Sequence, residues 1–193
     1  MQVVPTLASY PPPTMNSFEN ISTGSSSGGQ GSYIFISGAG FTGATQVSFG
    51  RTPAQSIFVE TNGGGIIAVV GSGSSGSISV TTPGGAASIA GFVFVPAPAI
   101  TSFAPTSAGS GNAVVITGTN FTGATAVSFG GTPALSFTVN SDTQITASVD
   151  RGSSGSVSFT TLGGTATSIT DFTFIQAPTI MCKRDDGLHF GPG

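Results

Sequence analysis

The sequence has very few charged residues. Lysine and arginine together number 4, and aspartate and glutamate number 7, in 193 residues, for a formal net charge of -3. The basic residues, Arg51, Arg151, Lys183 and Arg184, are scattered or near one end and form no patch that could neutralise a run of phosphates. We therefore expect no nucleic-acid partner. Little repulsion opposes contact between copies of such a chain, which favours self-association.

Cysteine, histidine and tryptophan are almost absent. The single cysteine, Cys182, excludes an internal disulfide, and the single histidine, His189, lies in the same C-terminal segment. A metal site would need further ligands that the sequence does not supply, so neither a metal nor a cofactor is expected. With no tryptophan and only two tyrosines, the chain has little material for an aromatic carbohydrate platform.

Long hydrophobic runs are also missing. The longest uninterrupted run, Ile66 to Val70, has the length of a strand, so we expect no membrane insertion. Residues 1–13 have neither a basic n-region nor an apolar h-region and predict no signal peptide within them. Export would therefore imply earlier processing or a longer chain.

The residues that are present predict a folded protein with a neutral, hydroxyl-rich surface. Hydrophobic residues make up 38% of the chain and include 15 phenylalanines, whereas disordered chains combine low hydrophobicity with high charge.

One sequence unit occurs twice. Phe41–Gly50, FTGATQVSFG, returns 80 residues later as FTGATAVSFG at Phe121–Gly130. The first copy carries about five extra residues in the Ser/Gly-rich stretch Thr23–Ser32, where a surface loop tolerates an insertion. The repeats predict an N-terminal extended arm at residues 1–13, a first domain at 14–98, a second domain at 99–178 and an irregular C-terminal tail at 179–193.

Within each unit, apolar residues alternate with polar ones, and no stretch has helical periodicity. About seven short strands in roughly 80 residues predict an all-β fold of two tandem immunoglobulin-like β-sandwiches. In the second copy the strands are expected near residues 100–103, 114–117, 127–129, 137–139, 145–149, 157–159 and 172–174. The same alternation places Phe129, Phe137, Phe159, Phe172 and Phe174 in the core. Gly40 and Asn120 occupy matching positions, which predicts a left-handed turn residue there.

No motif in the chain predicts an enzyme. Gly24–Gly28 matches the nucleophile-elbow pattern and Gly71–Gly76 the dinucleotide fingerprint, but neither precedes a helix, as both motifs require. No acidic residue within the repeats is duplicated, so neither a pair of catalytic carboxylates nor a repeated calcium cage is predicted. Asn20 and Asn120 fit the glycosylation acceptor pattern, although a turn explains Asn120 better.

Three segments of the second copy resemble the IPT/TIG family: PAITSFAPTS from Pro98, VITGTNF from Val115 and VSFGGTP from Val127. The resemblance covers residues 14 to 178, and the first copy departs from it at Glu19-Asn20, where the family usually has a proline. It implies an early-set immunoglobulin-like fold found in bacterial surface proteins, plexin-type receptors, accessory modules of starch-acting enzymes and Rel-type transcription factors. Fold alone does not set the function.

The junction Val95–Ile100 contains two prolines, which predicts a stiff rod and not two domains on a flexible tether. We therefore expect an extracellular or cell-surface structural or adhesive protein, a filament subunit or a segment of a repeat array, whose partners are copies of itself. One hypothesis is that the arm Gln2–Pro13 or the C-terminal tail packs on a neighbouring subunit by strand addition. The alternative is a glycan- or protein-binding accessory module of a secreted protein.

Overall fold

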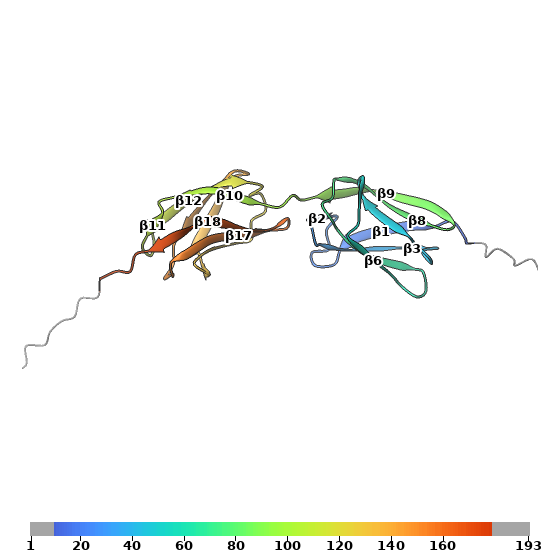
Figure 1. The fold of residues 1–193 in the computed structure, drawn as a ribbon, viewed down its shortest axis with the longest axis horizontal. Helices are drawn as coiled ribbons and strands as arrows, with labels where there is room; N and C mark the ends of the chain where they lie inside the picture. The colour runs from blue at the N-terminus through green and yellow to red at the C-terminus, as the bar shows by residue number, and fades with distance from the viewer. Residues whose placement is uncertain (1–9, 179–193) are drawn as a thin grey trace, which may run out of the picture.

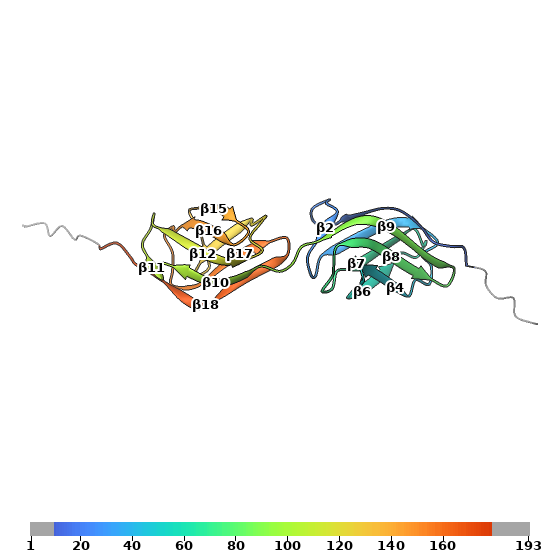
Figure 2. The same cartoon turned by 90° about the horizontal axis from the view of Figure 1, so that it is seen from above.

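A computed structural model describes residues 10–178, and every regular element in that range is a β-strand. Figure 1 shows two β-sandwiches placed end to end, and Figure 2 shows the same arrangement from above. Residues 1–9 of the arm and the tail with Cys182 and His189 lie outside the described residues. Residues 10–178 also contain no helix that could span a membrane.

The first repeat consists of two antiparallel layers. One sheet has the strand order β1-β3-β7-β6 and the other the order β2-β9-β8-β4-β5, in which the short β2 pairs with β9 in parallel. The strands are β1 Thr14–Asn20, β2 Ser27–Gly28, β3 Tyr33–Ala39, β4 Gln46–Phe49, β5 Thr52–Pro53, β6 Ser56–Val59, β7 Gly65–Val69, β8 Gly76–Thr82 and β9 Gly85–Phe94.

The second repeat has the same topology, with sheets β10-β12-β16-β15 and β11-β18-β17-β13-β14. Its strands are β10 Ala99–Ala104, β11 Ser107–Ala108, β12 Ala113–Thr119, β13 Ala126–Phe129, β14 Thr132–Pro133, β15 Ser136–Ser141, β16 Gln144–Ser148, β17 Gly155–Thr161 and β18 Gly164–Phe174. The predicted all-β class and the tandem immunoglobulin-like sandwiches are confirmed.

The strand prediction was incomplete in two respects. Each repeat contains two additional two-residue strands, β2 and β5 in the first and β11 and β14 in the second. The last strand, β18, begins at Gly164, although the phenylalanine alternation indicated only its final residues. The pairing of β17 with β18 contains a register shift between Ser156 and Ser158. This irregularity interrupts the period-two alternation along β18, so the sequence pattern indicates only the last part of the strand.

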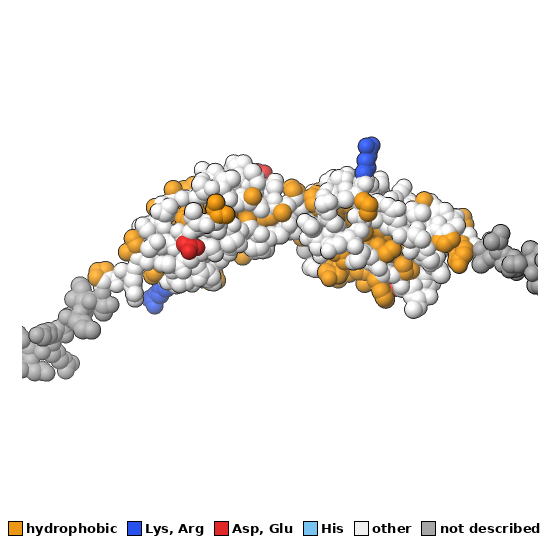
Figure 3. Space-filling model, in the orientation of Figure 1, with side chains coloured by type: hydrophobic (Ala, Val, Ile, Leu, Met, Phe, Trp, Pro, Cys, Tyr) orange, Lys and Arg blue, Asp and Glu red, His pale blue; other side chains and the backbone are white. Residues whose placement is uncertain are grey.

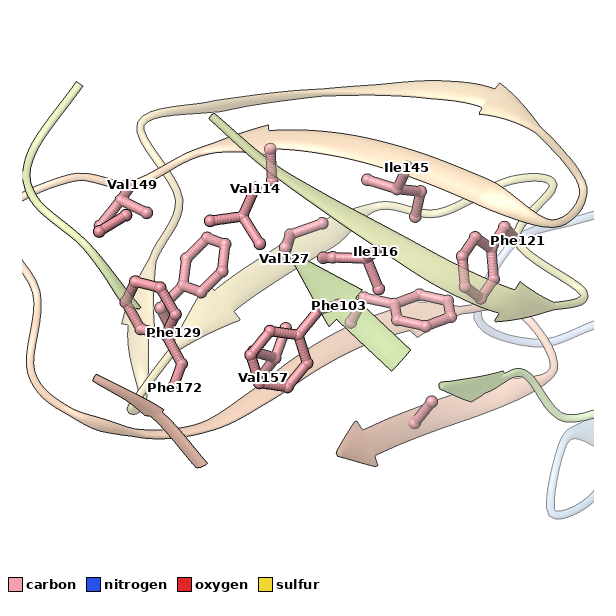
Figure 4. Close-up of a cluster of buried hydrophobic side chains, with 14 residues drawn as sticks. Phe103, Val114, Ile116, Phe121, Val127, Phe129, Ile145, Val149, Val157 and Phe172 are labelled. Atoms are coloured by element: carbon pink, nitrogen blue, oxygen red, sulfur yellow. The ribbon is translucent and has the colours of Figure 1, made fainter. Parts of the chain in front are cut away.

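Each sandwich encloses its own hydrophobic core. Figure 4 shows that of the second repeat, where the Phe129 and Phe172 ring centroids lie 4.9 Å apart and those of Phe121 and Phe159 lie 4.5 Å apart. Tilted and edge-on pairs of this kind add to the stabilisation from area burial. The cores share no member, so each repeat is stabilised by its own side chains.

The core prediction holds for Phe129, Phe159 and Phe172, which are at most 1% exposed. It was too strong for Phe137 and Phe174, which are only partly buried and pack against the edge of the core. Phe137 lies on β15, an edge strand, and Phe174 ends β18, so each ring has neighbours on fewer sides.

The predicted left-handed turn residue is confirmed in both repeats. Gly40 has a φ of 73°, and Asn120, at a φ of 60°, is the only non-glycine residue with positive φ among residues 10–178. The turn directs the chain inward, so that Phe41 and Phe121 are fully buried. Asparagine is one of the few side-chain-bearing residues that tolerate this conformation.

Asn20 occupies the position where the second repeat has Pro105. It is 1% exposed, its amide donates to the carbonyl of Ser27 at 2.9 Å, and its Oδ1 accepts from the N–H of Ser22 at 3.0 Å. These bonds close the longer loop of the first repeat over its own backbone. Part of the stretch expected to be a surface loop is therefore ordered as β2, and Gly28 and Gly29 are buried.

Candidate functional site at the junction of the repeats

The short segment Val95–Pro98 joins the two sandwiches and is bonded to both. The N–H of Val95 donates to the carbonyl of Gly28 in the first repeat at 3.1 Å. The side-chain amide of Asn120 in the second repeat donates to the carbonyl of Ala97 at 2.8 Å. Because Pro96 and Pro98 also fix their own φ, the linker has few ways to bend.

The tip of the β17–β18 hairpin packs back against the linker and the first repeat. A Cβ added at Gly29 would lie 2.6 Å from the Cα of Gly163, 2.8 Å from the carbonyl oxygen of Leu162 and 2.9 Å from that of Val95. Real Cβ atoms are not found so close to backbone, so the backbones of the two repeats touch where neither has room for a side chain. This contact and the linker together form what we call the joint.

A cleft of about 300 Å³ opens beside the joint. Apolar side chains line it together with polar side chains from two turns of the second repeat. The apolar residues are Phe94, Val95, Pro96 and Leu162, and the polar ones are Asn120, Thr122 and Asp142.

Asp142 provides the only carboxylate of this cleft. The hydroxyl of Thr122 donates to its Oδ1 at 2.8 Å, and the N–H of Thr122 donates to the same oxygen at 3.2 Å. These bonds favour the charged form and hold the pKa of Asp142 below its ordinary value. The same bonds hold the carboxylate in place as a hydrogen-bond acceptor on the cleft.

The cleft has the components of a binding site. It pairs apolar contact with amide, hydroxyl and carboxylate groups. Among residues 10–178, no group of three His, Cys, Asp or Glu side chains comes close enough together to hold a metal ion. The two glycine-rich motifs fall elsewhere: Gly24–Gly28 lies in the loop closed by Asn20, and Gly71–Gly76 connects β7 to strand β8.

The free end of the second repeat carries the counterpart of the surface that receives the hairpin. Gly109, Phe174 and Ile175 occupy the positions that Gly29, Phe94 and Val95 hold in the first repeat, and the N–H of Ile175 donates to Ala108 as that of Val95 donates to Gly28. Among residues 10–178 no further hairpin packs against them, and a groove of about 800 Å³ is present. It is lined in part by Gly109, Arg151, Phe174, Ile175 and Gln176.

The beginning of the first repeat carries the counterpart of the other side of the joint. A Cβ at Gly84, on the tip of the β8–β9 hairpin, would lie 2.8 Å from the carbonyl carbon of Pro11, just as one at Gly163 would lie 2.7 Å from that of Pro96. Residues 10–13 of the predicted arm thus pack on their own sandwich in the manner of the linker. The groove at Gly109 therefore matches the first-repeat side of the joint, and the Gly84 hairpin matches the second-repeat side.

The residues of the joint could not be identified from sequence. Gly29 and Gly163 are two of 30 glycines, and both stand in stretches that read as ordinary turns. The turn function of Asn120 was predicted, but its bond to the linker was not. A usable signal was the recurrence of a proline-containing segment before each repeat, at Pro11–Pro13 and Pro96–Pro98.

The fold and the joint define a protein of two tandem immunoglobulin-like domains that are in direct contact and are both bonded to the linker. The chain belongs to the IPT/TIG domain family, whose model matches it twice, at residues 13–94 and 98–182. No curated protein sequence matches it.

Three solved structures illustrate its structural similarities. SGBP-B from a complex xyloglucan utilization locus in Bacteroides uniformis shares 18% identity over 83% of this chain and 49% of its own, with a TM-score of 0.40. The surface glycan-binding protein PbSGBP-B of Prevotella bryantii shares 16% identity over 83% and 42%, with a TM-score of 0.39. The extracellular region of plexin A4 shares 19% identity over 88% and 16%, with a TM-score of 0.49. The chain thus spans less than half of the length of each of these proteins.

Proposed function

We propose that this protein is a non-enzymatic structural module of an extracellular or cell-surface assembly, a filament subunit or a segment of a repeat array that associates end to end. The observation that carries the proposal is the joint. Two direct bonds to the linker and a backbone contact between repeats hold the sandwiches in one orientation. Two domains held in one orientation fix the distance and direction between the two ends of the protein. This suits a rigid rod better than a hinge that opens or closes when a ligand binds.

The two ends support end-to-end association. The groove around Gly109 and Ile175 is open where the first repeat receives the tip at Leu162–Gly163. The hairpin tip at Gly84, with residues 10–13 beside it, repeats the shape of that tip. We infer that the groove accepts the Gly84 hairpin of the next copy, which gives a heterologous contact and an open chain. We retain the division into an arm at 1–13, domains at 14–98 and 99–178 and a tail at 179–193 as part of this proposal.

The test is electron microscopy and light scattering on the full chain and on a chain lacking residues 1–9. Thin fibres with a repeat matching two sandwiches are expected for the full chain. Removing residues 1–9 spares the segment 10–13 that packs on the first repeat, so folding should be retained and only an arm-dependent assembly lost. Polymers that persist unchanged would exclude the arm as the connecting element. Persistence after a further Gly109→Val change, together with deletion of residues 179–193, would exclude end-to-end association through this groove.

A second candidate function is binding of a glycan or a protein loop in the cleft beside the joint. The combination of Phe94 and Leu162 with Thr122 and Asp142 favours it, since apolar contact with a few convergent polar groups is typical of ligand sites. A glycan array probed with the native chain and with Asp142→Ala distinguishes this candidate. Specific binding that the substitution removes would support it, and absence of binding would leave the structural function alone.

A further inference from the structure

The first repeat has a sheet that is apolar on both of its faces. Its sequences YIFI at 33–36, SIFV at 56–59 and IIAVV at 66–70 are nearly continuous hydrophobic runs. The corresponding segments of the second repeat, AVVI, SFTV and ITASV, carry more small or polar residues at the positions facing outward. Continuous runs are typical of strands covered on both sides, whereas strict alternation is typical of strands with one wet face.

The strand register shows which side chains share the outer face. Phe35 on β3, Ile67 on β7 and Phe58 on β6 are direct cross-strand partners, and Tyr33 lies opposite Val69 in the next row. Ile21 extends this row, because its N–H donates to the carbonyl of Tyr33 at 3.0 Å. We call these six residues the outer patch: Ile21, Tyr33, Phe35, Phe58, Ile67 and Val69. Figure 3 shows hydrophobic side chains gathered on the first repeat near β6.

The second repeat provides an internal control for the outer patch. At the positions of Phe58, Ile67 and Val69 it has Thr138, Thr146 and Ser148, and at those of Tyr33 and Phe35 it has Ala113 and Val115. The inward positions of the same strands are apolar in both repeats. The fold therefore requires the inner face and does not require the outer patch, which points to a further use of this face.

The outer patch has the area of the apolar part of a protein interface. Tyr33 is 54% exposed, Phe58 64% and Ile21 52%, and the other three residues are partly exposed. With fully exposed aromatic side chains at about 200 Å² each, the patch presents roughly 400–500 Å² of apolar surface. One partner of a standard interface contributes about 800 Å², of which somewhat more than half is apolar. The patch therefore fits a flat partner of comparable size better than a short peptide or a sugar.

The charges around the outer patch leave an identical face as a suitable partner. The residues on and beside it include two carboxylates and no cation: Glu19 is exposed on β1, and Glu60 lies over Gly65 next to the edge of the Phe35 ring. An anionic partner is disfavoured, and no strong field attracts a cationic one. Flat sheet faces pack on one another at about 10 Å, the geometry that already joins the two sheets of each sandwich.

We propose that the outer patch is a lateral docking surface for a second copy of this chain, in which two first repeats pair face to face around a two-fold axis. The contact is isologous and closes at two copies, so it is independent of the open end-to-end contact proposed above. Glu19 and Glu60, at the margin of the outer patch, weakly repel the same residues of the second copy, so added salt strengthens the pairing.

The test is sedimentation equilibrium of the full chain, with a monomer mass of 18.9 kDa, from micromolar to millimolar concentration. The mass of a Gly109→Val chain, in which the end-to-end groove is blocked, should rise toward twice this value, and the substitutions below are compared in this background. A Phe58→Thr/Ile67→Thr/Val69→Ser variant carries the residues of the second repeat and should pair at least tenfold more weakly, with an unchanged melting midpoint. Ile169→Thr, which alters a 97% exposed side chain on the second repeat, should pair like the native chain.

Several results would overturn the proposal. A native chain that stays monomeric to millimolar concentration would do so, as would a triple variant that pairs as tightly as the native chain. A Gly109→Val variant, in which the groove of the end-to-end contact is blocked, should still form pairs, because the outer patch lies on the first repeat; if only the ends mattered, this variant would be monomeric. Should the triple variant fail to fold, the single change Phe58→Thr, on an edge strand, gives the same comparison with a smaller expected loss of pairing affinity.

Discussion

The joint can be tested with a single methyl group. In Gly29→Ala the new Cβ would lie 2.6 Å from the Cα of Gly163, whereas ordinary van der Waals contact begins near 3.4 Å. The backbones of the two repeats must therefore separate by about 0.8 Å or the hairpin tip must move. Overpacking of this kind costs roughly 1–3 kcal/mol, which shifts the equilibrium between a closed and an open joint about ten- to a hundredfold toward the open form.

The free end supplies a matched control for this change. Gly109 holds the same position in the second repeat, and among the described residues a Cβ there would meet only the carbonyl oxygen of Ile175, at 3.0 Å. Nitrogen-15 relaxation of the native chain and of Gly109→Ala should fit one elongated body. In Gly29→Ala the two sandwiches should tumble with separate correlation times, while the melting of each repeat changes little. If both variants behave as one body, the contact between Gly29 and Gly163 does not hold the repeats together.

Three further changes test the core, the turn and the carboxylate. Phe129→Ala should destabilise the second repeat by about 3–5 kcal/mol and lower its calorimetric transition by more than about 10 °C, leaving the transition of the first repeat in place. Asn120→Ala loses the bond to the linker and places alanine at positive φ, at a cost of about 1–2 kcal/mol in urea unfolding, whereas Asn120→Gly should lose only the bond. In an NMR titration Asp142 should have a pKa below the ordinary aspartate value; its contribution to stability is present above that value and is lost as pH falls through the folded pKa. Thr122→Val should return this pKa toward the ordinary value.

The fold was predictable because its determinants are local or repeated. Alternation of apolar residues marked the strands, and the exchange of Gly40 for Asn120 showed that the backbone conformation, and not the side chain, was required there. The core was predictable for the same reason: residues two apart on a strand face the same layer. Phe137 and Phe174 departed from this prediction because burial also depends on whether a neighbouring strand covers the position.

The joint was not predictable because its contacts join residues far apart in the chain. Gly29 and Gly163 are separated by most of both repeats, and a glycine required for close approach looks the same in sequence as one required for a turn. The outer patch was accessible in principle. The run Ile66–Val70 is apolar throughout, whereas the corresponding segment Ile145–Val149 of the second repeat alternates, and this difference marks an apolar outer face.

The outer patch is present on the first repeat and not on the second, and this difference affects how copies assemble. Both repeats keep the inner faces, the left-handed turn and the packing of a hairpin tip on a preceding segment, so the second repeat is a complete sandwich without an outer patch. If the ends join as the middle does, every copy along a rod is oriented like its neighbour, and the outer patch recurs once per two repeats in a fixed direction. Lateral pairing at one patch then aligns the next, so that many weak face-to-face contacts act together, as in multivalent binding. A joint opened by Gly29→Ala removes this alignment, and bundling of rods should decrease even though the outer patch is untouched.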